Sequence, residues 1–455
     1  MTNNDCMQKP NWLEFKKKKK ELKEKYKAKH FNDIYVSIAI KQIGEKLRRS
    51  DCSKLERKLL ILKAHDLLKT NYNKVIFTHD ISRIIQWILR YCDANIRQII
   101  FEELRPSVLS MIESKYAKNC IKIMLKHGSQ EIRRKIISTC YGNVIKFMCH
   151  SVSAPLLELI YSTWATKIEK RYFKQEFYGD MYKQAKDKQI KTLSDTYKTA
   201  EDMKAATLSA VKGNLMRILN KKLLKSTLLH CVLLEFLNNC SKEDKAEIIT
   251  MLRSAMIELS QTKFGSKVAA ICIWYGTNKD RKMIMKSFKG NTKNISMSEH
   301  GYLILLALFD SVDDTVLIKK IILSEIENDL IDITLNDYGK HVILYLVARR
   351  NSHYFAPNFI SNSLIESVIT YTPIWMSNSS IAMVTLAILK VKKWIECNRG
   401  CFLLILLMEN EAVSTVNILF SKLKPMMNIL TSKSNPGAKI LCKKLYCNGN
   451  YKHIV

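Results

Sequence analysis

Two pairs of neighbouring residues carry side chains that could transfer protons: His79 with Asp80, and Cys149 with His150. A carboxylate can orient an imidazole as a general base, and an imidazole can activate a thiol as a nucleophile. Adjacent side chains on a helix, however, point about 100° apart. We therefore favour capping or core roles for both pairs over catalysis.

Metal and cofactor chemistry also finds little support. Asp310, Asp313 and Asp314 could suggest a cation site, but carboxylates between two helices are typical of helix capping. The ten histidines lack HExxH spacing, and neither GxxxxGK[ST] nor GxGxxG occurs. We predict a protein that is not an enzyme and that uses no cofactor.

The thirteen cysteines are an odd number without the spacing of a disulfide framework. The late pairs Cys397 with Cys401 and Cys442 with Cys447 lack CxxC geometry, which disfavours zinc. Most of the thirteen are better interpreted as reduced core thiols in a cytosolic or nuclear compartment.

Charge is the strongest compositional signal. The chain has 74 Lys and Arg against 42 Asp and Glu, a formal net charge of +32. A charge of this size repels itself unless a polyanion neutralises it, and phosphate backbones are the commonest such partner. A membrane surface is the rival partner, but the basic residues run along the whole chain and are not gathered beside an anchor. Nucleic acid is favoured.

The elements that would present this charge are expected to be helices. Gly (13) and Pro (7) are scarce among 455 residues, whereas a sheet-rich chain needs many tight turns. No signal peptide follows the early lysines, and the apolar run from Cys401 to Met408 is too short to span a bilayer. We interpret that run as a buried helix.

An internal period predicts the fold. Segments around Ser82, Lys118 and Ala154 align at steps of 36 residues, each with apolar residues at helical spacing. The register returns with some drift at Ser226, Ser266, Tyr302 and Lys340, and a glycine precedes each of the last three. We interpret these glycines as tight links into a helix. Multi-helix units at this period indicate an all-α solenoid.

The periodicity suggests five regions. Residues 1–70 form a basic helical arm that includes a lysine run, which is also a candidate nuclear address: Lys16, Lys17, Lys18, Lys19 and Lys20. Residues 71–165 and 216–350 hold two repeat arrays, and residues 166–215 form a basic helical connector with an exposed loop that could act as a hinge, bind phosphate or simply be solvated. Residues 351–455 hold degenerate helical repeats.

Several segments together resemble the Pumilio (PUF) repeat family, in particular its divergent nucleolar Puf-A branch, whose members carry a C-terminal CPL (penguin) domain. They include GSKVAA at 265–270 and DYGKHVILY at 337–345, with further matches at 45–52, 79–86, 101–104, 274–282, 299–301 and 307–314. The likeness covers roughly residues 15–360. The last hundred or so residues match the CPL region only weakly and look shortened. The resemblance implies stacked three-helix repeats whose second helices line an inner surface.

In ordinary PUF proteins, side chains at i, i+1 and i+4 of that helix read one base, since i and i+4 share a helix face and i+1 can stack. Only Ser82, Arg83 and Gln86 look like such a reading trio. The other trios lack amide or acid readers, several offer lysine, and the trio of Tyr302 looks like packing. The candidate nucleic-acid-binding residues are Ser82, Arg83, Gln86, Lys118, Asn119, Lys122, Ser226, Thr227, His230, Ser266, Lys267, Lys340 and His341.

These observations support three functions. The first is weakly selective binding of structured RNA, with DNA as an alternative ligand, by a monomeric protein of the nucleus and nucleolus. The resemblance implies that the RNA is pre-ribosomal RNA and that the protein works with pre-ribosomal proteins in large-subunit assembly. The second is sequence-specific repression of mRNA through the Ser82 trio. The third is a protein-docking solenoid whose charge binds acidic partners.

Overall fold

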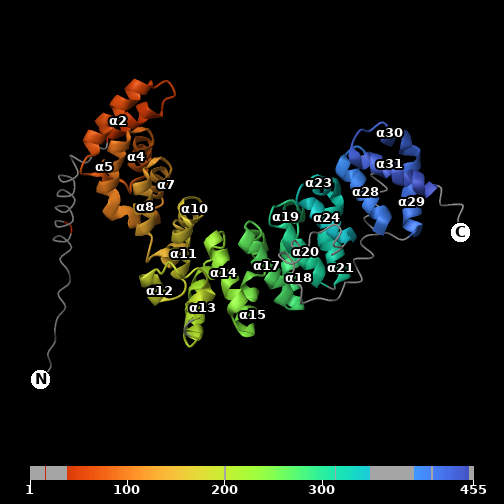
Figure 1. The fold of residues 1–455 in the computed structure, drawn as a ribbon. Helices are drawn as coiled ribbons and strands as arrows, with labels where there is room; N and C mark the ends of the chain where they lie inside the picture. Colours follow the sequence, from red (N-terminus) through yellow and green to blue (C-terminus); the bar gives the residue numbers. More distant parts are fainter. Residues whose placement is uncertain are drawn as a thin grey trace. The chain divides into compact units, whose positions relative to one another are not determined.

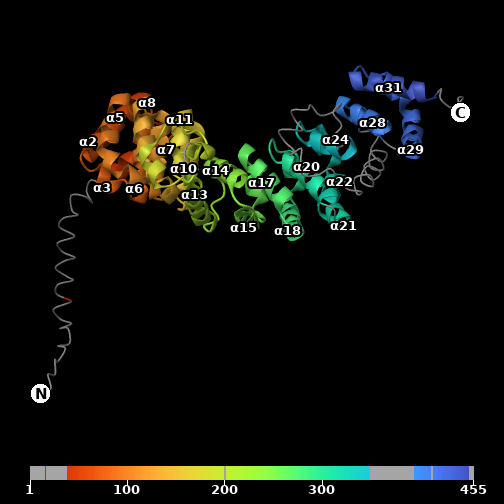
Figure 2. The ribbon, with the colours of Figure 1, turned by 60° about the horizontal axis from the view of Figure 1, so that its bottom comes forward.

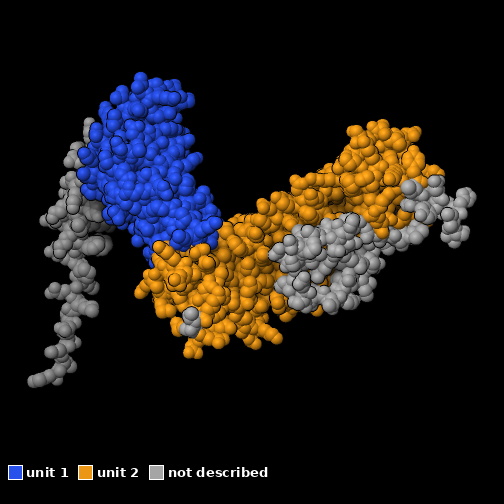
Figure 3. All heavy atoms as spheres, in the orientation of Figure 1, with its two compact units in different colours: residues 1–170 blue, residues 171–455 orange. Residues whose placement is uncertain are grey.

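The computed structural model describes residues 16, 38–198, 201–312, 314–348, 394–410 and 413–449. Within these ranges every regular element is a helix (Figure 1). The chain divides into two compact units, Met1–Lys170 and Arg171–Val455 (Figure 3). The division between the two units falls within one helix, α11 (Lys167–Gln175).

The first unit repeats a pattern of three helices: a long outer helix, a short helix and an inner helix. Helical residues 38–48 precede the first complete repeat. The following helices, with the 3₁₀ or π turns that extend some of them, are α2 (Lys54–Leu68), α3 (Tyr72–Val75), α4 (His79–Tyr91), α5 (Ala94–Leu104), α6 (Val108–Glu113), α7 (Lys118–His127), α8 (Gln130–Thr139), α9 (Val144–Met148) and α10 (Ala154–Leu159).

The second unit continues the same pattern after a less regular start. Its helices are α12 (Asp180–Ala185), α13 (Met203–Leu219), α14 (Thr227–Asn239), α15 (Lys242–Leu252), α16 (Met256–Leu259), α17 (Lys263–Tyr275), α18 (Asn278–Phe288), α19 (Thr292–Ser296), α20 (Tyr302–Ser311), α21 (Thr315–Ile318), α22 (Ser324–Asn328), α23 (Leu330–Leu335), α24 (Gly339–Ala348), α28 (Asn398–Asn410), α29 (Val413–Leu423), α30 (Met427–Thr431) and α31 (Pro436–Gly449).

Inner helices pack on inner helices, so no repeat buries its apolar face alone. In the first unit α4 packs against α7, and in the second α14, α17, α20 and α24 pack in succession. Figure 2 shows this row in the second unit beside a separate row of outer helices, α15, α18 and α21. The α-solenoid that the period predicts is confirmed, as are the three-helix repeats that the resemblance implies.

Glycines mark the entry to several inner helices because the backbone approaches them closely. A Cβ at Gly301 would lie 2.7 Å from the carbonyl oxygen of Ile295, six residues earlier. Gly265 and Gly339 face the carbonyl oxygens of Leu259 and Ile333 in the same way. The φ of Gly301 is −65°, so the tight link does not depend on a left-handed backbone. Contact with the preceding short helix requires glycine instead.

The same relation extends the repeat pattern into the C-terminal block. A Cβ at Gly400 in α28 would clash with the carbonyl oxygen of Trp394, again six residues earlier. The helices α28 and α31 pack against each other like the inner helices before them. The predicted buried helix from Cys401 to Met408 is confirmed as part of α28, with Leu404 fully buried.

Arginines close the C-terminal ends of inner helices. Arg97 in α5 donates from Nε to the carbonyl of Leu89 (2.8 Å) and from its terminal nitrogens to those of Cys92 (2.7 Å) and His127 (2.8 Å). Arg133 and Arg281 likewise donate from Nε to the carbonyl eight residues earlier, at 2.8 Å and 2.9 Å. A cation is favourable there because the last carbonyls of a helix lack partners within the helix. The C-terminal end of the helix dipole is also negative. These arginines therefore stabilise the stack.

Substitution of Arg97 by alanine should lower the free energy of unfolding by about 2–3 kcal/mol, because three charge-assisted hydrogen bonds are lost. Chemical denaturation followed by circular dichroism measures the effect. The control is Lys126→Ala, at an exposed position of α7, which should change stability by less than about 0.5 kcal/mol. Equal effects of the two substitutions would contradict the structural role of Arg97.

The region predicted as a connector is tied firmly to the second unit. Glu235 of α14 accepts hydrogen bonds from Lys174 Nζ (2.5 Å), Tyr178 OH (2.6 Å) and the backbone N–H of Leu193 (3.1 Å). Gln175 also donates to the carbonyl of Ile190 at 3.1 Å. Residues 171–197 thus pack on the first inner helix of the second unit. Whether they also bind phosphate stays a prediction.

Candidate nucleic-acid interface

Four of the thirteen candidate residues are buried. Ser82 Oγ lies 3.7 Å from Cys120 Sγ, between α4 and α7. Ser226 caps α14 by accepting from the N–H of Leu229 (3.4 Å), and Ser266 Oγ donates to the carbonyl of Lys263 (3.1 Å). His230 is the fourth. For these four positions the structure gives helix packing or capping in place of the base contact that the sequence predicts.

His230 is held neutral by its surroundings. Its Nδ1 lies 2.7 Å from Oγ1 of Thr262, the N-cap of α17, and burial lowers the pKa of the imidazole to about 4. The folded-state pKa is below the ordinary value of 6.5, so protonation is easier in the unfolded chain. The stabilisation is therefore complete above about pH 6.5 and is lost as the pH falls towards 4.

We expect acidification from pH 7 to pH 5 to destabilise the second unit by about 2 kcal/mol through His230 alone. Urea denaturation at both pH values, for the wild type and for His230→Gln, isolates this contribution. The variant has no titrating group at this position, so its stability should depend less on pH by that amount. An unchanged pH dependence would show that His230 is not responsible.

In the first unit the remaining candidates stay accessible. Arg83 on α4 is exposed, while Gln86 on α4 and Lys118, Asn119 and Lys122 on α7 are half-buried. Lys118 Nζ lies 3.4 Å from the carbonyl of Val152. Among the described residues no carboxylate forms an ion pair with Arg83, Lys118 or Lys122, so their charge is available to an anion. Since α4 packs on α7, three cations lie on neighbouring inner helices.

The second unit adds four half-buried candidates and an aromatic stack. Thr227 lies on α14 and Lys267 on α17, and Lys340 and His341 lie on α24. The ring of Tyr302 stacks on those of His341 and Tyr338, with centroids 5.5 Å and 6.1 Å away. Tyr338 is 36% exposed, so it can present an aromatic edge or face to a ligand.

This stack was missed because Tyr302 alone looked apolar enough for packing. The signal was present in the sequence: Tyr302 and Tyr338 are 36 residues apart, the spacing of the first repeats. Two aromatic residues one period apart come side by side when repeats stack. Leu306, from the same trio as Tyr302, is buried as predicted.

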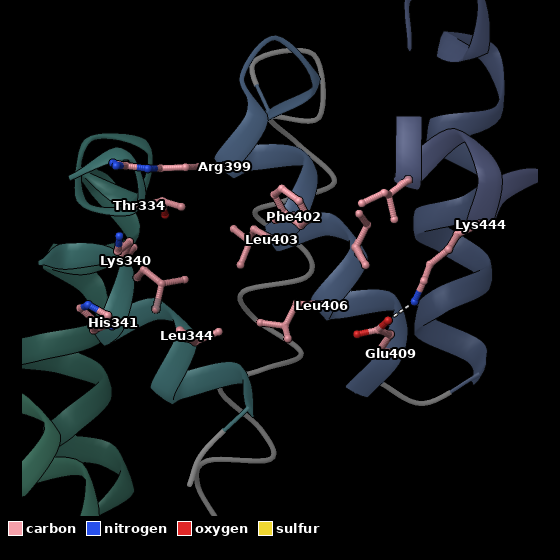
Figure 4. Close-up of a pocket in the computed structure, with 13 residues that line it drawn as sticks. Thr334, Lys340, His341, Leu344, Arg399, Phe402, Leu403, Leu406, Glu409 and Lys444 are labelled. Atoms are coloured by element: carbon pink, nitrogen blue, oxygen red, sulfur yellow. Dashed lines mark hydrogen bonds and ion pairs between the residues drawn. The ribbon is translucent and has the colours of Figure 1, made fainter. Parts of the chain in front are cut away.

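Lys340 and His341 border a hollow of about 460 Å³ between α24, α28 and α31 (Figure 4). Its lining is mainly apolar, with Leu344, Phe402 and Leu406 among its walls. Its charged groups are matched: Arg399 pairs with Asp337, Lys444 pairs with Glu409, and Lys340 Nζ lies 3.9 Å from the Asp337 carboxylate. The hollow therefore contributes little unpaired charge.

The rejected catalytic pairs need one correction. His79 Nδ1 and Asp80 Oδ1 are 2.8 Å apart, so the expectation that these neighbours point away from each other was wrong. Both are exposed in the first turn of α4, where no preceding turn constrains their side chains, and Asp80 also pairs with Lys41 at 2.9 Å. Hydrogen bonds from His79 and Lys41 lower the pKa of the Asp80 carboxyl. The pair is thus part of a surface ion cluster.

The aspartates considered as a cation site and the buried cysteines have structural surroundings. Asp310 accepts a hydrogen bond from the hydroxyl of buried Tyr345, and Asp314 accepts from the N–H of Leu317 (2.9 Å), as a cap does. Asp313 lies outside the described residues. Burial raises the pKa of the Cys120 thiol to about 12, which suits an unreactive core residue.

The described part of the chain offers neither a metal-binding cluster nor a membrane-spanning helix. Within the described ranges of residues 38–449, no group of three His, Cys, Asp or Glu side chains could hold a metal ion. In the same part of the chain, no helix combines the length and apolar character needed to cross a bilayer. The predicted arm residues Lys17, Lys18, Lys19 and Lys20 lie outside the described residues, and Lys16 is exposed.

Stacked three-helix repeats with cationic inner helices define an α-helical repeat protein of the PUF type. No family model matches the chain. Rat (Rattus norvegicus) Pumilio homolog 3 is 33% identical over 353 residues, which cover 77% of this chain and 55% of the relative. Protein penguin of Drosophila melanogaster is 36% identical over 409 residues, covering 83% and 55%.

The structure is also similar to solved structures of Puf-A. The crystal structure of human Puf-A in complex with DNA matches with a TM-score of 0.83 and 26% identity, covering 91% of this chain and 86% of that one. The predicted relationship is confirmed: this is a PUF-repeat protein related to Puf-A and penguin. The chain spans about half the length of the curated relatives it matches.

Proposed function

We propose that the chain binds nucleic acid, RNA in the first place, through phosphate contacts and with weak sequence selectivity. One observation carries the proposal: of the positions that would read bases, four hold a buried serine or histidine, and several of the accessible ones hold cations. Lys118, Lys122 and Lys267 are such cations. Lysine binds phosphate as a point charge and does not distinguish bases.

Sequence-specific reading through the first trio is disfavoured. Ser82 is fully buried against Cys120, so only Arg83 and Gln86 remain to contact a base. One incomplete trio discriminates at a single position at most. The Tyr302–Tyr338 stack can instead support an unpaired base by stacking, which every base tolerates.

The relatives support nucleic acid as the ligand. A solved structure similar to this chain is described as human Puf-A in complex with DNA. Because phosphate contacts do not depend on the sugar, binding of both DNA and RNA is consistent with the proposed interface. The net charge of +32 acts in the same direction.

Affinity measured across a salt series tests the mechanism. Each neutralised phosphate should add about 0.7–0.9 to the slope of log affinity against log salt concentration. A steep slope and no consensus after selection from randomised RNA are the expected results. A flat slope would exclude the electrostatic mechanism, and a strong consensus would favour the mRNA repressor. Partner binding that survives excess polyphosphate would favour the protein-docking solenoid.

We further propose that the chain is located in the nucleolus and acts on pre-ribosomal RNA during large-subunit assembly. It would act there as a monomer in contact with pre-ribosomal proteins. The support is the relationship to Puf-A, together with the absence of a base-reading code, which suits structured RNA. Crosslinking in cells followed by sequencing of bound RNA tests the target, and imaging of the tagged chain tests the location. Recovery of mature mRNA alone would contradict this role.

A further inference from the structure

One outer helix of the second unit has an exposed face that carries only positive charge. The exposed charged residues of α18 and of the position that follows it are Lys279, Lys282, Lys286 and Lys289. Their spacing of three, four and three residues places them along one side of the helix, over about 15 Å. Figure 2 shows α18 in the outer row, apart from the inner helices α17 and α20.

The other charged residues of α18 do not offset these lysines. Asp280 is buried: it closes a capping box with Thr277 and pairs with Arg253 at 3.1 Å. Arg281 is directed to the carbonyls of Ile273 and Trp274. The helix has no other carboxylate. The four lysines are therefore its whole exposed charge.

Some lysines elsewhere in the outer surface are neutralised locally. Lys135 on α8 pairs with Glu102 (2.7 Å), and Lys212 pairs with Asp244 of α15 (2.7 Å). Lys293 on α19 pairs with Asp329 at 2.7 Å. No carboxylate among the described residues forms an ion pair with any of the four lysines of α18. Their charge is thus left for an external anion.

The neighbouring element extends this surface. The π-helical turn η4 (Lys319–Leu323) packs against α18 and exposes Lys319 and Lys320. Between α18 and α21 lies a hollow of about 380 Å³, with Lys279 and Lys282 in its wall. Among the described residues that line it, the one carboxylate is that of Asp314, which accepts from the N–H of Leu317 at 2.9 Å. The hollow gives a polymer room to lie beside the lysines.

The side chains favour a phosphate backbone over a protein. Protein interfaces are depleted in lysine and need an apolar centre, but Met283 is the only large apolar side chain exposed on α18. Single-stranded nucleic acid is usually held by stacking on aromatic rings, and α18 exposes no aromatic residue. A base-paired segment, whose bases are already stacked, needs only cations that follow its phosphates.

We propose that the exposed face of α18, with Lys319 and Lys320, is a second RNA-binding surface that holds the phosphate backbone of a double-helical segment. A folded RNA would then contact this outer face as well as the inner helices. The inference rests on the proposed function in that the polymer is RNA, and it adds a site outside the inner surface.

The experiment compares two probes, a hairpin RNA with a stem longer than α18 and a short oligouridine that forms no duplex. Three proteins are used: the full chain, a variant with all four α18 lysines replaced by glutamine, and a control with glutamine at Lys54, Lys58, Lys63 and Lys69. The control residues are exposed on or directly after the outer helix α2 and remove the same charge. Circular dichroism and melting temperature verify that each variant folds.

The α18 variant should bind the hairpin about tenfold or more weakly at 0.15 M salt, with a salt slope lower by about 3, and should bind oligouridine like the wild type. The control should lose less than about threefold on the hairpin. Equal losses in variant and control would overturn the proposal. So would a hairpin affinity that is unchanged while polyglutamate binding is lost, which would assign the face to an acidic protein. If the wild type binds neither probe, the proposed function itself fails.

Discussion

Replacing Arg83, Lys118 and Lys122 together by glutamine is expected to weaken RNA binding by about tenfold or more at 0.15 M salt. These three cations lie on the packed inner helices α4 and α7 and form no ion pair with a carboxylate among the described residues. Each can neutralise one phosphate and release its counterion. The slope of log affinity against log salt concentration should therefore fall by about 2, as measured by filter binding over a salt series.

The matched control removes the same charge from the outer surface of the same unit. Glutamine at Lys54, Lys58 and Lys63 of α2 changes three exposed lysines and leaves the inner helices intact. This control should keep most of the affinity, because screening limits the effect of distant charges. If both triple variants lose affinity equally, binding depends on total charge and the inner helices are not a defined interface.

Gly265→Ala is expected to lower the free energy of unfolding by about 3 kcal/mol, the largest effect on stability among these predictions. A Cβ there would clash with the carbonyl oxygen of Leu259 and would come within 2.8 Å of His230 Nδ1 and 2.9 Å of Thr262 Oγ1. The carbonyl belongs to the backbone of α16, so it cannot rotate away. Either α16 or α17 must shift, and α17 also packs against α14 and α20.

Gly213→Ala is the control for this substitution. Gly213 lies within α13, and a Cβ there would meet no atom within 4 Å. Alanine is the better helix former and should stabilise the chain by about 0.5–1 kcal/mol. Denaturant unfolding of both variants gives opposite signs if close approach is the reason for Gly265. A loss of stability at Gly213 as large as that at Gly265 would show that another property of glycine is responsible.

Stability and RNA binding are linked in a solenoid, because the stacking of the repeats positions the binding residues. A shift between α16 and α17 would move Lys267 relative to Thr227 on the neighbouring inner helix α14. Gly265→Ala should therefore also weaken RNA binding at a temperature where the variant is still folded. The size of this loss depends on how many phosphates the second unit contacts.

The repeat architecture and the cationic character of the chain can be predicted from its amino-acid sequence. Apolar periodicity within each helix is a local property. This pattern returns every 36 to 40 residues, with Gly265, Gly301 and Gly339 in register, and so shows how one repeat follows another. The count of basic over acidic residues needs no structure. The resemblance to the Puf-A branch also needs no structure, because it rests on short segments and on their order along the chain.

Which polar residues are accessible depends on tertiary packing and cannot be predicted from the sequence. Ser82 and Arg83 are adjacent in sequence, yet Ser82 is buried because Cys120, 38 residues later, packs on it. Burial and ion pairing both depend on partners one repeat away. For the same reason the sequence did not show that Arg97 binds the carbonyl of His127 in the next repeat. Nor did it show that the lysines of α18 form no ion pair with any carboxylate among the described residues. A helical pattern specifies a face, but only the neighbouring repeat decides whether that face meets protein or solvent.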